Sequence, residues 1–168
     1  MPELIAPEAH RHAAWLQAHR EWGPGAHEDG FGLLHDDEVD SPDGFAAWVA
    51  RLRSSSGPDR CTYRWIIEGE QVLGGIALRH SYSELVREAG HIGYGIRPSA
   101  RRRGVATWAL GRMLDEARAA GLARVLIVCA AENAASARTI ECQGGVLEEI
   151  RATEFGPARR YWIDLDTR

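Results

Sequence analysis

The chain has 168 residues, with 24 acidic side chains, 20 arginines, no lysine and a formal net charge of −4 at pH 7. This length suits a single domain, 1–168, with one sizeable core. The acidic balance argues against a dedicated nucleic-acid-binding protein, which needs a basic face. The absence of lysine excludes Schiff-base catalysis by that residue.

No apolar run is long enough to span a membrane, and the N-terminus has no signal-peptide pattern. We therefore expect a cytoplasmic protein that does not bind membranes. The cysteines Cys61, Cys129 and Cys142 show no C-x-x-C spacing, which favours reduced thiols. Cys129 and Cys142 are expected to be small apolar core residues. The histidines show no metal-binding spacing, so no metal is expected.

The N-terminal part predicts a short strand and two helices. The strand is expected at residues 3–5, and a helix with an apolar stripe follows over residues 7–20. Ser41-Pro42 combines a hydroxyl N-cap with proline at the first helical position. This pair predicts a second helix, which ends at the serine run that begins at Ser54.

Residues 21–50 hold eight acidic side chains and no arginine. Seven of them lie close together along the chain: Glu28, Asp29, Asp36, Asp37, Glu38, Asp40 and Asp43. One interpretation is a solvated loop, which is the common fate of charge runs. The other is a lip whose summed field attracts a cationic amine. The sequence supports both equally.

From residue 62 the pattern becomes rich in strands. A hairpin is expected from strands 62–68 and 71–79, followed by a polar connector over 80–89. The remaining expected elements are a strand at 90–97, a helix at 105–120, a strand at 125–128, a helix at 135–143, and strands at 146–153 and 160–166. Strand, helix and strand over residues 90–130 predict a βαβ crossover with parallel strands, because the run 125–128 is apolar throughout.

The turn over residues 98–107 has the composition of an anion site. It joins an expected strand to an expected helix and contains three arginines and Gly104. The first N–H groups of a helix have no internal partner and attract anions. Gly104 allows close backbone approach, and arginine is a planar donor for phosphate. This turn therefore predicts a seat for a cofactor that carries a diphosphate.

The same region resembles the GNAT acyltransferases, which transfer an acyl group from coenzyme A. The motifs that carry the resemblance are Arg101-x-x-Gly104-x-Ala106, Ile96-Arg97-Pro98, the sequence His91-Ile92-Gly93-Tyr94, Asn133-x-x-Ser136 and Gly144-Gly145. The resemblance implies an α/β (α+β) fold. It implies a mixed central sheet of about six to seven strands, splayed between the fourth and fifth strands and flanked by about four helices.

The resemblance implies acetyl-CoA as the cosubstrate, lying in the splay with its diphosphate on the turn before the third long helix. The residues expected to bind it are Ile96, Arg97, Arg101, Arg102, Arg103, Gly104, Val105, Ala106, Thr107, Asn133 and Ser136. Asn133 and Ser136 are also expected to cap the helix that they begin.

A general base is expected near the fourth strand, where many family members carry a glutamate. This chain has glycine and His91 there, and His91 titrates near neutral pH. A structural role for His91 is the alternative interpretation, because a lone histidine in a strand is more often structural. Glu88 is a weaker candidate for the base, and Glu84 is weaker still.

A general acid is expected by resemblance seven residues after the asparagine, where many family members have tyrosine. That position is Ile140 in this chain, so the usual acid is missing. Tyr94 and Tyr161 are the remaining candidates, and each could equally be a hydrogen-bonded core tyrosine. A thiolate also leaves with little help, so a protein acid is not required.

Together these features predict an N-acetyltransferase that transfers an acetyl group from acetyl-CoA to a primary amine of a small molecule. The expected mechanism is direct attack in a ternary complex, with main-chain stabilisation of the oxyanion. The alternative is a non-catalytic acyl-CoA-binding sensor with the same fold. By resemblance we expect a monomer or a homodimer, with a lean towards the homodimer.

Overall fold

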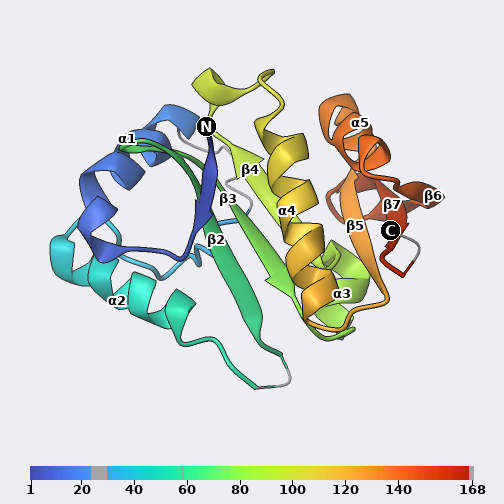
Figure 1. The fold of residues 1–168 in the computed structure, drawn as a ribbon, viewed down its shortest axis with the longest axis horizontal. Coiled ribbons are helices and arrows are strands. Elements are labelled where there is room, and N and C mark those ends of the chain that lie inside the picture. The colour runs from blue at the N-terminus through green and yellow to red at the C-terminus, as the bar shows by residue number, and fades with distance from the viewer. Residues whose placement is uncertain (24–29, 58, 167–168) are drawn as a thin grey trace.

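The computed structural model describes residues 1–23, 30–57 and 59–166. Figure 1 shows its elements in chain order. They are β1 (Glu3–Ile5), α1 (His12–Trp22), α2 (Pro42–Arg53), β2 (Cys61–Glu68), β3 (Gln71–Arg79), α3 (Glu84–Ala89), β4 (Ile92–Ile96), α4 (Val105–Ala119), β5 (Arg124–Ala130), α5 (Ala134–Cys142), β6 (Val146–Thr153) and β7 (Gly156–Asp164). Within these described residues, no helix is both long and apolar enough to cross a membrane.

The strands form two sheets rather than one. The first has the order β1-β2-β3-β4 and the second the order β5-β7-β6, and every ladder is antiparallel. The expected splay between the fourth and fifth strands is therefore confirmed, and so is the α/β fold class. No ladder joins β4 and β5 within the described residues, because these two strands diverge. In the described part of the chain they are linked by an isolated antiparallel bridge between Gly90 and Ile127.

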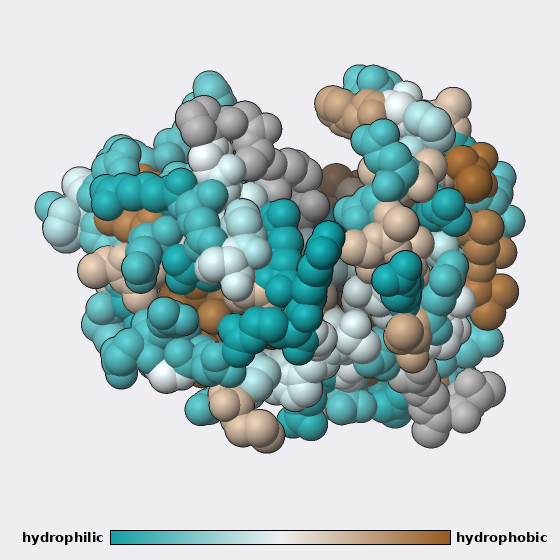
Figure 2. Space-filling view, turned by 90° about the horizontal axis from the view of Figure 1, so that it is seen from above, coloured by the Kyte–Doolittle hydropathy of each residue, from teal (hydrophilic) through white to brown (hydrophobic). Residues whose placement is uncertain are grey.

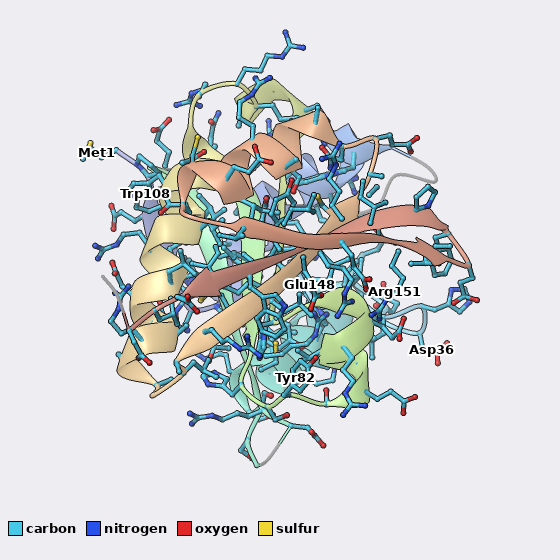
Figure 3. The ribbon with its side chains drawn as sticks, turned by 90° about the vertical axis from the view of Figure 1, so that its right-hand side faces the viewer. Met1, Asp36, Tyr82, Trp108, Glu148 and Arg151 are labelled. Carbon is cyan, nitrogen blue, oxygen red and sulfur yellow. The ribbon has the colours of Figure 1, made fainter. Side chains whose placement is uncertain are left out.

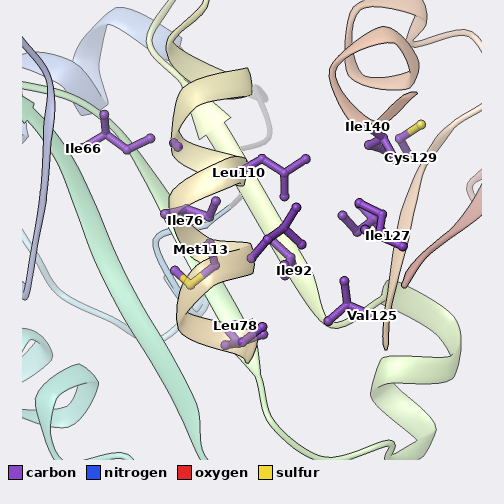
Figure 4. Close-up of a cluster of buried hydrophobic side chains, with 14 of the residues drawn as sticks. Ile66, Ile76, Leu78, Ile92, Leu110, Met113, Val125, Ile127, Cys129 and Ile140 are labelled. Atoms are coloured by element: carbon purple, nitrogen blue, oxygen red, sulfur yellow. The ribbon is translucent and has the colours of Figure 1, made fainter. Parts of the chain in front are cut away.

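The two sheets separate where β4 and β5 diverge, and we call this separation the split. Two apolar cores fix its position. One lies between α4 and the sheets, where Leu110 and Met113 pack on Ile76, Ile92 and other strand residues (Figure 4). The other lies on the opposite side of the first sheet and is rich in aromatic side chains, most of them from α1, α2 and β2. Burial of large apolar side chains in both cores is the main stabilising contribution of the fold. The first sheet and α4 thus form a rigid wall on one side of the split.

Helix caps explain where several elements begin. The Ser41 hydroxyl accepts a hydrogen bond from the Gly44 N–H at 3.0 Å, as the sequence predicts for the start of α2. Helix α3 lies in the segment 80–89, which was expected as a polar, helix-tolerant connector, and Ser83 caps it by accepting from the Val86 N–H at 3.3 Å. Helix α1 begins later than predicted, because Glu8 is extended and residues Ala9–Arg11 form a 3₁₀ turn.

The final hairpin is tighter than the sequence predicts. Strand β7 begins at Gly156 instead of residue 160, and Gly156 and Pro157 pair with Thr153 and Ala152 of β6. A glycine and a proline together favour a turn by composition. Here the turn is already complete at residues 154–155, so the next residues continue directly as strand.

Candidate active site

The N-terminus of α4 is an open site for an anion. Its N-cap is Gly104, in the left-handed conformation with φ 75°, and no side chain caps it. The N–H groups of Val105, Ala106 and Thr107 belong to the first turn, where a helix provides no acceptors. A Cβ built on Gly104 would meet no atom within 4 Å, so the space beside Gly104 is open. These features suit a diphosphate.

The three arginines before this helix have different surroundings. Arg101 donates through Nε to the Ile96 carbonyl at 2.9 Å, and Arg103 pairs with Glu68 at 2.7 Å. Arg102 is exposed, has φ 62°, and has no ion pair among the described residues. A left-handed conformation at a residue with a Cβ costs about 1 kcal/mol or more and commonly occurs at functional sites. Of the three guanidinium groups, that of Arg102 is the one available to a phosphate.

The split between the sheets opens towards this same end of the molecule. Figure 1 shows the N-termini of α4 and α5 on either side of it, and Figure 2 shows a notch between the two halves. Tyr94 of β4 and Ser136 of α5 meet across the split, with 2.7 Å between their hydroxyl oxygens. Asn133 caps α5 by accepting from the Ser136 N–H at 3.1 Å. The structure thus brings together three of the predicted site residues.

Arg97 has a different environment from the one expected for a cofactor ligand. It is buried, donates to the Glu21 carboxylate, and donates to the Val72 carbonyl at 3.2 Å. The same carboxylate accepts from the Ser99 N–H at 2.6 Å. These bonds tie α1 to the turn before α4. The guanidinium of Arg97 therefore serves the fold, and no local pattern in the sequence marks Glu21 as its partner.

His91 closes the narrow end of the split. Its backbone N–H donates to the Leu126 carbonyl at 2.7 Å, and its ring Nδ1 accepts from the Leu126 N–H at 2.8 Å. Burial and the nearby charge of Arg79 lower the pKa of His91 to about 4. The ring is therefore neutral at pH 7 with its lone pair engaged. This geometry favours the structural interpretation of His91 over the catalytic one.

This arrangement predicts a loss of stability in mild acid. Because the folded pKa of His91 lies below its ordinary value of 6.5, the unfolded chain binds the proton more readily. The stabilisation is present above pH 6.5 and is lost as the pH falls towards 4. We expect a loss of about 2 kcal/mol from this group between pH 7 and pH 4.5.

Urea unfolding at the two pH values measures this contribution in the wild type and in His91→Asn. Asparagine keeps an acceptor near the Nδ1 position but does not titrate, so its free energy of unfolding should fall less. Exposed His10 supplies the matched control, since His10→Asn should show the wild-type fall. An equal fall in His91→Asn and in the wild type would contradict the assignment.

The fold places the other candidate acids and bases in different parts of the structure. Glu88 and Glu84 are exposed on α3, beside the closed end of the split. Tyr161 is buried and donates to Glu141 at 2.7 Å, and burial raises its pKa. Ile140 is buried in the core. Tyr94 is therefore the tyrosine hydroxyl that reaches the split.

Two further expectations concern the cysteines and the acidic segment. Cys129 is buried, as expected, whereas Cys142 is exposed, because it lies on the outer face of α5. Asp37 pairs with Arg51, and Glu38 accepts from the backbone N–H of Ser41, so these two carboxylates stabilise the loop. Asp36, Glu38, Asp40 and Asp43 are exposed, and Glu28 and Asp29 lie outside the described residues. No cluster of metal-ligating side chains occurs in the described ranges.

Comparisons with known proteins agree with this geometry. A family model for the acetyltransferase (GNAT) domain matches residues 9–146. The ribosomal L7/L12 α-N-protein acetyltransferase RimL, solved with coenzyme A, superposes with a TM-score of 0.74 at 17% identity, over 99% of this chain and 96% of that one. The microcin C7 self-immunity acetyltransferase MccE, solved with acetyl-CoA and AMP, gives 0.71 at 14%, over 97% and 92%.

The spermidine/spermine N-acetyltransferase SpeG from Vibrio cholerae gives a TM-score of 0.70 at 14% identity, over 99% of this chain and 96% of that one. At these identities the structural matches show the shared fold. Among curated protein sequences, no relative matches the chain.

Proposed function

Because the chain belongs to the GNAT acetyltransferase family, and is thus an acyl-CoA-dependent acetyltransferase, we propose that its acceptor is a primary amine of a small molecule. Acetyl-CoA supplies the acyl thioester for this reaction, and the amine attacks it directly in a ternary complex. The observation that carries the proposal is the uncapped N-terminus of α4 at the open end of the split.

The diphosphate is bound by the main chain at this N-terminus. The amides of Val105, Ala106 and Thr107 donate to it, Gly104 provides the space, and Arg102 supplies the free guanidinium. Arg101 acts through its bond to Ile96, which holds the turn against β4. Arg103 is balanced by Glu68, so it contributes less positive charge to the seat.

The pantetheine arm follows the edge of β4 into the split, where Asn133 and Ser136 lie on the other side. Strand β4 pairs with β3 along one edge only, so its other edge has backbone groups for the arm and for the thioester carbonyl. Gly93 and Gly95 keep this part of the strand free of side chains. Main-chain donors at this edge stabilise the oxyanion.

Two side chains take part in proton transfer in the proposal. The Tyr94 and Ser136 hydroxyls, 2.7 Å apart, hold a proton for the departing thiolate. The two strongest candidates for the base are poorly placed for the task, because the His91 lone pair is engaged by Leu126 and Glu88 is exposed beside the closed end of the split. The proton of the amine passes to water in the split.

The negative charge of the protein supports a cationic amine as the acceptor. The protein carries a net charge of −4, and exposed carboxylates occur at Asp36, Glu38 and Asp40 before α2 and at Asp43 in its first turn. This field attracts a cationic amine. Among proteins with the same fold, SpeG acts on spermidine and spermine, and RimL on a ribosomal protein. A small polycationic amine agrees best with the acidic surface.

Release of free thiol from acetyl-CoA tests the proposal over a panel of polyamines, aminoglycosides, amino acids and N-terminal peptides. We expect amine-dependent thiol release with at least one of the small amines and little with the peptides. Turnover confined to the peptides would contradict the small-molecule acceptor. Tight CoA binding without turnover on any member of the panel would instead favour the sensor.

A further inference from the structure

The closed end of the split is held by a single residue that makes two bonds to the opposite strand. The His91 N–H donates to the Leu126 carbonyl at 2.7 Å, and the Leu126 N–H donates to the His91 ring Nδ1 at 2.8 Å. In a regular antiparallel pair, two main chains exchange both of these bonds. Here a side chain takes the place of one main-chain acceptor, so the bond depends on the identity of residue 91.

Gly90 allows the two strands to come this close. It forms the isolated bridge to Ile127, and a Cβ built on it would lie 2.9 Å from the Leu126 carbonyl oxygen. Its φ of 85° is also a conformation that residues with a Cβ rarely adopt. The His91 carbonyl accepts from the Arg79 N–H at 2.7 Å, which joins the same point to β3. We call Gly90, His91 and Leu126 the clasp, because they fix the distance between the two sheets.

Side chains fill both faces of the split at the clasp. On the face towards α4, Ile92 and Ile127 are each 1% exposed, and Figure 4 shows them in the gap between β4 and β5. On the opposite face, the His91 ring stacks with Tyr82 at 5.9 Å between centroids and lies edge-on to Trp162 at 6.4 Å. Figure 3 shows the labelled Tyr82 beside α3, where this helix meets β5. A chain that enters from the open end is therefore stopped at the clasp.

The room between the clasp and Tyr94 is short. Tyr94 lies three residues from His91, which is about 10 Å at the usual rise of a strand. Gly93 lies between them, and a Cβ built on it would meet no atom within 4 Å, so the space beside it is open. This space suits a small acyl group. A longer chain would have to displace Ile92, Ile127 or the His91 ring, and close-packed side chains resist such displacement.

We propose that His91 is a positioning residue that sets the depth of the split and thereby restricts the acyl group to a short chain such as acetyl. It acts through Leu126, because its two bonds hold β5 at a fixed distance from β4. The inference rests on the proposed place of acetyl-CoA in the split, and it is independent of the amine that accepts the acetyl group.

Titration of the wild type with thioesters of increasing length tests the depth of the split. The probes are coenzyme A and its acetyl, butyryl and hexanoyl thioesters, and no amine is added. Methylene groups that a pocket cannot accommodate cost affinity, so we expect hexanoyl-CoA to bind about tenfold more weakly than acetyl-CoA. Equal affinity for the three thioesters would overturn this proposal alone. Failure of every probe to bind would overturn the diphosphate seat at α4, and this proposal with it.

Two variants of His91 test the role of its bond to Leu126. Leucine and asparagine have nearly the same shape, and only asparagine offers an acceptor to the Leu126 N–H. In His91→Leu this N–H loses its partner, so β5 is released and the split deepens. We expect the preference for acetyl-CoA over hexanoyl-CoA to fall about tenfold in His91→Leu and to stay within about twofold of the wild type in His91→Asn. His10→Leu, the same replacement at an exposed histidine, should keep the wild-type preference.

Thermal unfolding shows whether each variant is folded. The same preference in His91→Leu and His91→Asn would show that the bond to Leu126 does not set the depth, and it overturns the proposal. If His91→Leu does not fold, Tyr82→Ala replaces it, because Tyr82 is half exposed and its loss leaves both bonds of the clasp in place. The ring that stacks on His91 is then missing, so we expect the preference to fall about threefold. An unchanged preference in Tyr82→Ala also overturns the proposal.

Discussion

Replacing Gly104 by aspartate is expected to weaken coenzyme A binding about 100-fold, which corresponds to about 3 kcal/mol. The new carboxylate would stand in front of the amides of α4, in the open space that the diphosphate requires. It would offer those amides an acceptor and would repel the anion. Isothermal titration of the folded variant with coenzyme A measures the change.

Gly104→Asn is the matched control for this experiment. Asparagine has nearly the same shape as aspartate and tolerates the left-handed conformation that Gly104 adopts at φ 75°. Both variants therefore carry the same backbone cost, and only the charge differs. We expect Gly104→Asn to bind coenzyme A about tenfold more tightly than Gly104→Asp. Equal affinity in the wild type and Gly104→Asp would place the diphosphate elsewhere.

Local chemistry explains why much of the fold was predictable. The start of α2 at Ser41-Pro42 follows from capping, and the start of β3 follows from the short hairpin turn at residues 69–70. Periodicity likewise places α4 to within one residue at its end. Pairing between distant strands has no such local signal. The run 125–128 is apolar because α4 and the second sheet bury it, and burial on both faces does not require a parallel neighbour.

In the candidate site, too, features set by local sequence were predictable, and features set by distant residues were not. The turn at Gly104 was predictable, because a glycine and an uncapped helix start are local features. The positions of His91 and Arg97 depend on Leu126 and Glu21, which are 35 and 76 residues away along the chain. Residue type alone marks both as polar and chemically capable. Only the fold shows that both are used to hold elements together, while Tyr94 reaches the split.

Removal of the Tyr94 hydroxyl is expected to lower kcat for acetyl transfer about 100-fold and to leave the affinity for coenzyme A nearly unchanged. The ring of Tyr94 packs against the core beside α4, so Tyr94→Phe keeps this contact and removes the hydroxyl that bonds to Ser136. Steady-state kinetics with an amine from the panel measure kcat, and titration measures the affinity. Tyr82→Phe, which changes an exposed tyrosine at the closed end, is the control and should leave kcat unchanged.

A double variant separates a shared proton path from two independent effects. If Tyr94 and Ser136 act as one unit, Ser136→Ala lowers kcat about as much as Tyr94→Phe, and the double variant is hardly slower than either one. Independent contributions would multiply instead. Unchanged kcat in both single variants would show that the thiolate leaves without help from the protein. The 2.7 Å contact would then be a brace between β4 and α5, keeping the split at a fixed width.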